Sequence, residues 1–556
     1  MIGVVTHERD RQIVGEFFEL FKTPWEFHVP GRPYEVVLSN AGAGDELQAP
    51  LVISFDAGRA GHDHDRGWPE NGAAETDVIR YGDRELPLYG GSSFIADNGR
   101  PFLWNARDGR IAGTRQRLAG RSLVRIGYDP FREAAILLER GQPPRRGGMP
   151  TLEWHIDIIR DLIANEGIPV VEIPPIPAGY RYAVCLTHDI DFLRFRDHLF
   201  DRTMLGFTYR ASLGSVIRLL QGRMSLRNVL KNFRALMKAP LVHLGLCPDF
   251  WVQIPLYMEL EKDWKSTFFF IPFEGRPGVP CGPGDSKSRA ARYDVTDIAG
   301  TIMTVVDGGF EVGLHGIDAW ADKDSAAEER RRLEPRSGTA GLGVRMHWLY
   351  WDKDTFRILD EAGFAYDSTF GYNDTVGYRA GTVQAYRPPG VDSLLELPLN
   401  AQDTALFFPG RMHLTEKDAS IVCERLMENS RRFGGALTLL WHDRSMAPER
   451  LWGDFYRDLL GTLEGDGAWI GPAGRAVQWF RKRRAAVFER VERVADGIEV
   501  RVKSTDGAPD NDVLPGLLLR VQYRREERES PREPSRQKNV IEMPLNINAT
   551  TRVPLR

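Results

Sequence analysis

Short, almost wholly apolar runs that alternate with helical patterns constrain the fold of this chain more than any other feature. Apolar side chains fill nearly every position of each run, so the runs lack the alternation of a half-exposed strand. Strands of this kind are typical of a parallel sheet that helices cover on both faces. Seven such runs lie at residues 182–186, 267–271, 310–314, 343–346, 364–366, 394–397 and 436–440. We therefore predict an α/β fold built on a distorted (β/α)7-type barrel.

The sequence on either side of these runs has a different pattern of apolar and polar residues, which predicts three domains. Residues 1–172 combine strand-like runs at 34–38 and 51–55 with a helical pattern at 129–138, and we expect an N-terminal α/β domain of unknown role. A proline-rich hinge at 173–177 separates it from the barrel, which we place at 178–484. Beyond the barrel, apolar and charged residues alternate, for example at 498–502, which predicts a small β-rich module over 485–556.

Composition and charge exclude several classes of protein. Hydrophobic residues make up 42% of the 556 residues and charged residues 27%, which excludes a disordered or fibrous chain. A formal net charge of −4 argues against a nucleic-acid partner. No apolar run reaches the roughly 18 residues that a bilayer-spanning helix needs. The N-terminus becomes charged early and the four cysteines lie far apart, so we expect a cytoplasmic protein with reduced thiols.

Polar side chains follow several of the predicted strands at their carboxyl ends, where barrel enzymes carry their active sites. Asp189 and Asp191 share one face of an extended strand, and two adjacent carboxylates repel unless a cation or a proton lies between them. Three histidines follow other strands: His315, His347 and His442. Two neutral imidazoles with one carboxylate suit Zn²⁺ or another divalent transition metal. The alternative interpretation is an exposed acidic turn beside ordinary structural histidines.

This set of residues is sufficient for metal-dependent hydrolysis. A divalent metal lowers the pKa of a bound water to about 7, and a nearby carboxylate can take the remaining proton. A histidine on the opposite side can protonate a departing amine. Removal of an N-acetyl group from a sugar fits this chemistry, because an amide is a poor acyl donor and its amine must leave protonated.

Five short motifs resemble those of the polysaccharide deacetylases, the carbohydrate esterase family four with its NodB-homology domain. The resemblance runs from about residue 180 to residue 484 and leaves both terminal regions uncovered. The motifs are Thr-His-Asp-Ile-Asp at 187–191, Gly-Leu-His at 313–315, Gly-Val-Arg at 343–345, Tyr-Asp-Ser-Thr at 366–369 and Leu-Leu-Trp-His at 439–442. They occur in the order that the family has.

The resemblance implies a role for each matching residue. Asp189 is implied as the general base and Arg345 as the residue that orients it. Asp191 and His315 are implied as metal ligands, and His442 as the general acid. The roles of the two aspartates remain exchangeable, because Ile190 separates residues that are adjacent in the family.

The third metal ligand departs from the family pattern. The family has a second histidine four residues after the first, where this chain has Ala319. We expect His347 to replace it, because it shares a strand face with Arg345, and Asp318 is the alternative. Five residues that could line the cleft stay outside the predicted site: Tyr372, Asn373, Arg379, Asp403 and Arg411.

A basic helical insertion at about 192–262 separates the first two barrel strands and is too long for an ordinary crossover. Residues 192–240 contain ten basic and two acidic residues, a net charge of +8, with apolar residues interleaved at helical spacing. One interpretation is a solvated helix pair beside the barrel. The other is a surface for peripheral contact with an anionic membrane or a lipid-linked glycan.

The predicted function is therefore a zinc-dependent or similar metal-dependent hydrolase that removes N-acetyl groups from a carbohydrate, a polysaccharide or a glycan precursor. Two alternatives use the same barrel. One is an amide or cyclic-imide hydrolase of a small molecule. The other is a non-catalytic glycan-binding or scaffold barrel, which the alanine at position 319 favours. The sugar, the linkage and the oligomeric state are left open.

Overall fold

A curled parallel sheet forms the centre of the molecule. The computed structural model describes residues 1–42, 47–55, 73–96, 98–118, 120–282, 289–338, 341–505, 513–524 and 538–555. The central sheet has the strand order β16-β15-β14-β13-β12-β11-β18-β17, with β19 paired to β11, and all of these pairs are parallel. Its strands are β11 (Ala183–Ile190), β12 (Thr267–Phe270), β13 (Glu311–Gly316), β14 (Gly343–Met346), β15 (Tyr366–Asp367), β16 (Leu395–Glu396), β17 (Ala401–Gln402), β18 (Ala436–Leu440) and β19 (Trp469–Gly471).

The predicted α/β fold with a distorted barrel is confirmed. All seven predicted strands are present, although β15 and β16 are shorter than their apolar runs suggest. The sheet curls without closing, because β16 and β17 are its two end strands. Two strands, β17 and β19, were not predicted. They have two and three residues, too few for a periodic pattern.

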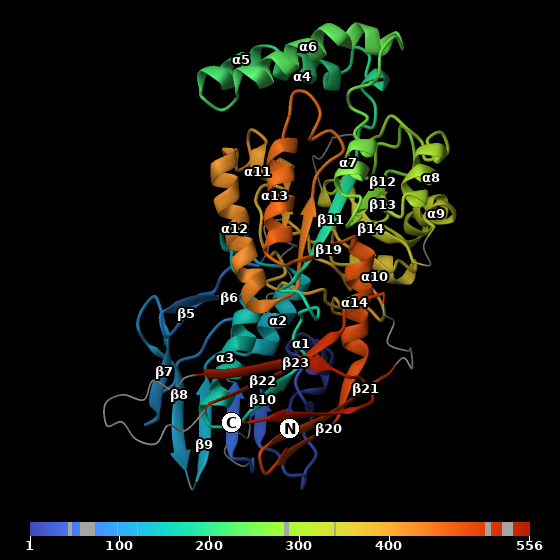
Figure 1. Ribbon diagram of the computed structural model, residues 1–556. Coiled ribbons are helices and arrows are strands. Elements are labelled where there is room, and N and C mark those ends of the chain that lie inside the picture. Colours follow the sequence, from blue (N-terminus) through green and yellow to red (C-terminus); the bar gives the residue numbers. More distant parts are fainter. Residues whose placement is uncertain are drawn as a thin grey trace.

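Helices flank the sheet on both sides (Figure 1). The helices α8, α9 and α10 lie on the side of β12, β13 and β14, and α11, α12 and α13 lie on the side of β18 (Figure 1). Their bounds are α8 (Ala299–Asp307), α9 (Lys323–Leu333), α10 (Thr355–Glu361), α11 (Asp403–Phe407), α12 (Glu416–Phe433), α13 (Gly453–Gly465) and α14 (Ala473–Ala485). Short 3₁₀ turns are η1 (Glu8–Asp10), η3 (Pro144–Arg146), η4 (Phe195–Asp197), η5 (Glu334–Arg336) and η6 (His347–Leu349).

The N-terminal region forms a second large sheet with the strand order β2-β1-β3-β4-β9-β8-β7-β5-β6. The first five strands in this order pair in parallel and the remainder are antiparallel. The strands are β1 (Ile2–Val5), β2 (Trp25–Phe27), β3 (Val36–Ser39), β4 (Leu51–Phe55), β5 (Asp77–Tyr81), β6 (Arg84–Leu88), β7 (Arg100–Asn105), β8 (Ile111–Leu118) and β9 (Arg121–Ile126). Its helices are α1 (Arg11–Phe21), α2 (Pro130–Glu139) and α3 (Thr151–Asn165).

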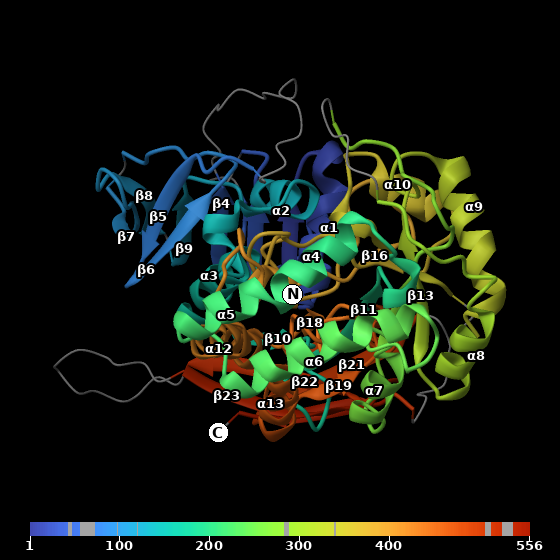
Figure 2. The same cartoon turned by 90° about the horizontal axis from the view of Figure 1, so that it is seen from above.

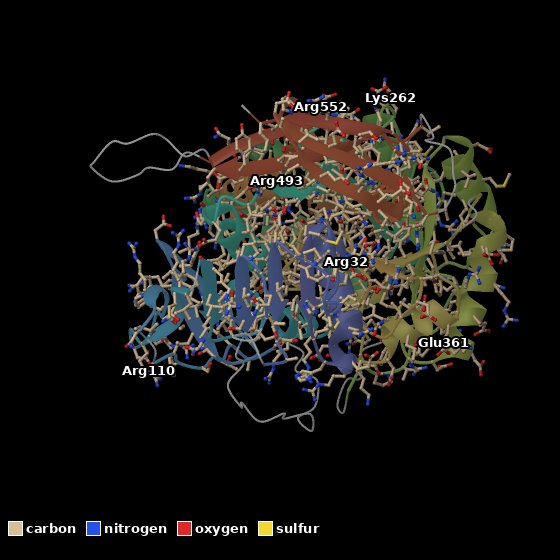
Figure 3. The ribbon with its side chains drawn as sticks, turned by 90° about the horizontal axis from the view of Figure 1, so that it is seen from below. Arg32, Arg110, Lys262, Glu361, Arg493 and Arg552 are labelled. Carbon is tan, nitrogen blue, oxygen red and sulfur yellow. The ribbon has the colours of Figure 1, made fainter. Side chains whose placement is uncertain are left out.

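The C-terminal region consists of antiparallel strands in two three-stranded sheets. The strands β20 (Ala486–Val494), β21 (Gly497–Ser504) and β24 (Thr550–Pro554) form one sheet. The strands β22 (Leu517–Arg524) and β23 (Lys538–Leu545) form the other, together with β10 (Val170–Glu172) from the end of the N-terminal region. Figure 3 shows the C-terminal strands beside the N-terminal sheet. Between the two regions, Nη2 of Arg493 lies 3.1 Å from Oε1 of Glu35. The division into three domains stays a prediction.

The N-terminal region and the parallel sheet share one hydrophobic core. This core contains Phe17 of α1 and Leu152 of α3 together with Leu314 of β13 and Leu439 of β18. Polar contacts also cross between the two parts: Thr382 donates a 2.7 Å hydrogen bond to the buried carboxylate of Glu153 on α3. The N-terminal region and the central part of the molecule are therefore joined by a continuous core.

Four helices occupy the chain between β11 and β12: α4 (Arg202–Ala211), α5 (Leu213–Leu220), α6 (Leu226–His243) and α7 (Ile254–Leu260). The first three form a layer at the upper end of the molecule, which Figure 2 shows from above. Throughout the described ranges, no helix combines the length and the apolar character that crossing a membrane requires.

Candidate metal centre

The parallel register gathers the predicted site residues at one edge of the central sheet. Asp189 lies near the carboxyl end of β11 and Asp191 directly follows that strand. His315 on β13 is the register partner of Arg345 on β14, and His347 follows β14. Because parallel strands end at the same edge, these side chains meet although they are up to 158 residues apart in sequence.

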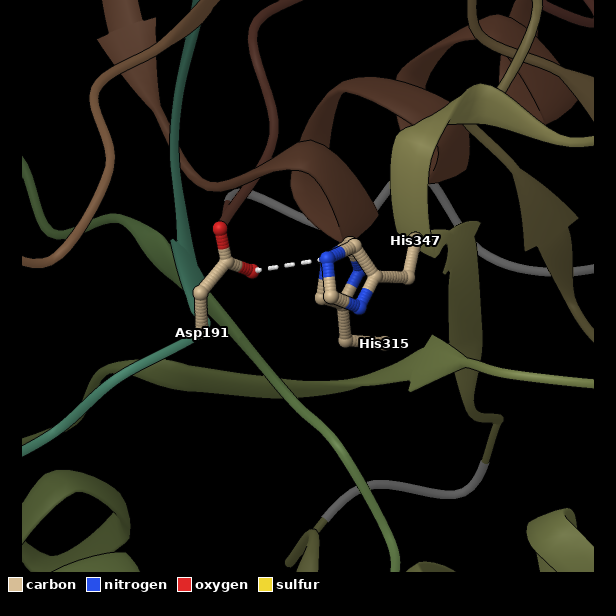
Figure 4. Close-up of side chains that lie close together, drawn as sticks. All are labelled: Asp191, His315 and His347. Carbon is tan, nitrogen blue, oxygen red and sulfur yellow. Dashed lines mark ion pairs between the residues drawn. The ribbon is translucent and has the colours of Figure 1, made fainter. Parts of the chain in front are cut away.

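Asp191, His315 and His347 form the candidate metal centre (Figure 4). Each offers one ligand atom, and the three atoms lie within 4.8 Å of one another. The Nε2 atom of His315 is 3.2 Å from Oδ1 of Asp191, and Nε2 of His347 is 3.8 Å from the same oxygen. The two imidazole rings stack with centroids 4.9 Å apart and an interplanar angle of 26°.

The hydrogen bond of His315 indicates that a proton or a cation lies between its ring and Asp191. Its Nδ1 lies 2.9 Å from the carbonyl oxygen of Arg345, which can only accept, so Nδ1 carries the proton in the neutral ring. The lone pair of Nε2 then faces the carboxylate of Asp191. Two acceptors at this distance require a proton or a cation between them.

Two further observations fit a cation. Oδ1 of Asp191 is buried and has no hydrogen-bond partner among the described residues. Burial lowers the pKa of His347 to about 3, so this ring is neutral at neutral pH and offers a lone pair. Burial raises the pKa of Asp191, but the histidines His347, His315 and His442 outweigh it and hold that pKa well below its usual value. Two imidazole nitrogens and one carboxylate oxygen are a donor set for zinc.

Asp189 lies beside the candidate metal centre and is held by a buried arginine. Nη1 of Arg345 donates to Oδ1 of Asp189 at 3.1 Å and to the hydroxyl of Thr187 at 2.8 Å. On its other side the same guanidinium donates to the carbonyl and hydroxyl oxygens of Ser368, both at 2.9 Å. Oδ2 of Asp189 lies 3.7 Å from Nε2 of His315, so one oxygen is fixed and the other faces the site.

His442 approaches from the opposite side, after β18. Its Nε2 is 4.0 Å from Oδ2 of Asp191, and its Nδ1 is 2.6 Å from Oδ1 of Asp403. Oδ2 of Asp403 also accepts the backbone N–H of His442 at 2.7 Å. Burial lowers the pKa of His442, but the Asp403 carboxylate more than offsets this and raises it above its usual value. The sequence prediction left Asp403 outside the site.

Asp403 was missed because the element that positions it was missed. It is the first residue of α11 and follows the two-residue strand β17, which carries no recognisable periodicity. The available signal for a site residue was an acidic side chain, Asp403, soon after the expected strand at 394–397. From sequence alone this residue could equally cap a helix.

Asp318, the alternative third ligand, lies apart from the candidate metal centre. Its carboxylate accepts the backbone N–H of Val279 at 2.7 Å and contacts Arg276 and Arg289 at 3.1 and 3.2 Å. The described cluster of candidate ligands includes His347 and not Asp318. Of the other residues left outside the prediction, Tyr372 and Arg379 are buried and hydrogen-bonded to backbone carbonyls of the core.

Helix α7 of the insertion contacts the strand ends beside the candidate metal centre. The sequence did not predict this contact. His188 faces away from Asp189 along β11, and its Nε2 lies 3.0 Å from Glu261, the residue that follows α7. Tyr257 on α7 donates a 2.8 Å hydrogen bond to the carbonyl oxygen of His442. The insertion is therefore joined to the strand ends that carry the site.

Comparisons with known proteins place polysaccharide deacetylases among the solved structures to which this chain is similar. A protein from Mycobacterium smegmatis, described as a polysaccharide deacetylase, is 19% identical, with 58% of this chain and 99% of that protein covered and a TM-score of 0.34. One from Pseudomonas aeruginosa, described likewise, is 17% identical, with 58% and 98% covered and a TM-score of 0.34. The PuuE allantoinase is 16% identical, with 55% and 92% covered and a TM-score of 0.32. No family model and no curated protein sequence matches the chain.

Proposed function

We propose that the protein is a metal-dependent hydrolase that removes N-acetyl groups from a carbohydrate. The observation that carries this proposal is the meeting of two imidazole nitrogens with a buried carboxylate oxygen that lacks a hydrogen-bond partner among the described residues. Asp191, His315 and His347 would hold a divalent cation, for which zinc fits the donor set. A bound cation would supply a Lewis acid and would make water available as hydroxide at neutral pH.

Asp189 is the proposed general base. Arg345 fixes one carboxylate oxygen and leaves Oδ2 directed towards His315, so that Oδ2 can take a proton from water at the edge of the centre. The guanidinium is itself fixed by Thr187 and Ser368, so the base has one orientation. A positioned base of this kind contributes about 10²–10⁴-fold to a rate.

His442 is the proposed general acid. The contact with Asp403 places the Nδ1 proton on the carboxylate side and leaves Nε2 facing the site. Because Asp403 raises the pKa of His442, the ring retains a proton at Nε2 to a higher pH than an ordinary histidine. That proton can be given to a leaving amine, which an amide substrate requires.

Separate base and acid groups favour catalysis over a scaffold role. Asp189 and His442 approach Asp191 from different strands, and each is oriented by its own buried partner. A glycan-binding module has no need of an oriented base and an oriented acid. The four cysteines are not joined in disulfide bonds, which supports the proposal of a reducing, cytoplasmic location.

Metal analysis followed by an amine-release assay tests the proposal. Purified protein loaded with zinc should bind about one equivalent and release amine from N-acetylated oligosaccharides. His315→Ala should lose both properties, while His7→Ala, at an exposed histidine remote from the centre, should keep both. Full turnover by a metal-free His315→Ala protein would refute the mechanism. Cleavage of a small cyclic imide, with no release from N-acetylated sugars, would favour the alternative hydrolase.

A further inference from the structure

Helix α6 carries an apolar stripe on the side that faces solvent. Large apolar residues recur along it at intervals of three and four, which places them on one face of a helix. Each is at least 40% exposed, and Met237 is 80% exposed. The stripe consists of Leu226, Leu230, Phe233, Met237, Leu241 and, directly after the helix, Leu244.

The opposite face of α6 holds the helix on the protein. Val229, Ala235 and Val242 are buried there. On the same face Asn232 donates to the hydroxyl of Ser215 at 2.8 Å and accepts the backbone N–H of Glu449 at 2.7 Å. Because α6 already packs through this face, the apolar stripe points away from the body of the protein.

A row of basic side chains flanks the apolar stripe. Arg227, Lys231, Arg234 and Lys238 are all exposed and lie along one side of it. The described part of the chain offers no ion pair to any of the four. Arg210 and Arg218, by contrast, reach inward and contact Glu449.

The neighbouring helix α5 extends the exposed apolar surface. Leu213, Val216, Ile217 and Leu220 follow helical spacing and are exposed, with Leu220 at 83%. Helix α5 packs beside α6 in the layer seen in Figures 1 and 2. From residue 202 to residue 248 the chain has no acidic residue. The layer therefore presents apolar and positive groups together.

We propose that the layer formed by α4, α5 and α6 docks on an anionic lipid surface. An apolar stripe beside Lys and Arg is the arrangement by which an amphipathic helix lies in a bilayer interface, with its basic side chains at the head groups. Charge complementarity favours anionic lipid over a second copy of this chain, whose formal net charge is only −4.

The layer also lies on the side of the molecule that carries the candidate metal centre. It follows β11 at its carboxyl end, and it contacts the segment after β18 at Glu449. Docking would hold that edge of the sheet near the membrane surface. Docking of this kind would not require the proposed hydrolysis.

Vesicle flotation with the full chain tests the proposal. Wild-type protein should float with phosphatidylcholine vesicles that contain phosphatidylglycerol, should not float with phosphatidylcholine alone, and should lose binding as salt rises. The triple variant Lys231→Gln, Arg234→Gln and Lys238→Gln should bind on the order of 100-fold less tightly. The double variant Leu230→Ser and Met237→Ser should bind at least about tenfold less tightly.

Matched variants outside the layer control for charge and hydrophobicity. Arg331→Gln, Lys353→Gln and Arg425→Gln make the same change of charge at exposed positions outside α4, α5 and α6. Met303→Ser and Ile421→Ser remove exposed apolar groups from α8 and α12. Both controls should bind like the wild type. All variants change exposed side chains, and circular dichroism would verify that they fold.

Three results would overturn the proposal. One is wild-type protein that does not float with anionic vesicles. Another is unchanged binding in both the basic and the apolar variants. The third is a wild-type dimer, seen by light scattering, that dissociates in the Leu230→Ser and Met237→Ser variant without any vesicle binding, because a second copy would then cover the layer.

Discussion

In most proteins charged side chains are exposed and large apolar side chains are buried. The candidate metal centre and the α4–α6 layer each depart from one half of this rule. The centre buries charged groups, and most of them have fixed partners, as Asp189 has in Arg345 and His442 has in Asp403. The layer exposes large apolar side chains and leaves the four basic residues beside the α6 stripe without an ion pair to any described residue. Buried charge is costly without a partner, and a contiguous exposed apolar surface marks a place of contact. Each departure therefore points to a function, one chemical and one interfacial.

The largest expected effect separates the two aspartates of the centre. Asp191→Asn should lose bound zinc and reduce amine release on the order of 10³-fold or more, because it removes a ligand charge. Asp189→Asn should also reduce release but keep its zinc, because this residue lies beside the cluster. Metal content measured by mass spectrometry alongside the assay distinguishes them. Loss of zinc in Asp189→Asn alone would mean that the two roles are exchanged.

Removing Arg345 should have the next largest effect, on stability. Arg345→Met leaves the buried Asp189 carboxylate without its ion pair and should lower the free energy of unfolding by about 3–5 kcal/mol. Chemical denaturation measures this change. The exposed Arg331→Met on α9 is the control and should change it by no more than about 0.5 kcal/mol. The double variant Asp189→Asn, Arg345→Met should recover part of the loss, and no recovery would contradict the assigned pairing.

Asp403→Asn should have a smaller effect on the rate and a distinct effect on its pH dependence. We expect kcat to fall about 10²-fold, since the general acid loses its orienting partner. In the proposed mechanism the protonated form of His442 is the active one, so activity should fall as pH rises through its pKa. Asp403 raises that pKa, and its neutralisation should move the alkaline limb of the profile to lower pH. An unmoved limb would exclude His442 as the acid.

The smallest expected effect is the change in the free energy of unfolding when exposed apolar residues of the layer are replaced. Leu230→Ser with Met237→Ser should change the free energy of unfolding by no more than about 0.5 kcal/mol per site, because both side chains are exposed. Denaturation of the variant beside wild type measures it. A much larger loss would show that the stripe packs against the protein, and the contrast with the centre would disappear.

The sequence predicted those parts of the molecule that carry a local signal. Strands such as β12 and β18 are continuous apolar runs and were predicted at or within one residue of their bounds. The strand β17 was missed because two residues have no period, and Asp403 was missed with it. In α6 the spacing of Leu226, Val229 and Leu230 indicated a helix, but periodicity cannot tell which apolar residue faces the protein. Val229 is buried and the two leucines are exposed, because α6 packs on the protein through the face that also carries Asn232, which accepts the backbone N–H of Glu449.

The hydrophobic core shared by the first 165 residues and the parallel sheet has a practical consequence for any shortened version of this chain. A fragment that begins at the proline hinge would lose the part of this core that α1 and α3 contribute, including Phe17 and Leu152, and would leave Thr382 without its acceptor on Glu153. Such a fragment would expose apolar surface and would tend to aggregate in solution. Any expressed version of the chain should therefore keep the N-terminal region together with the parallel sheet.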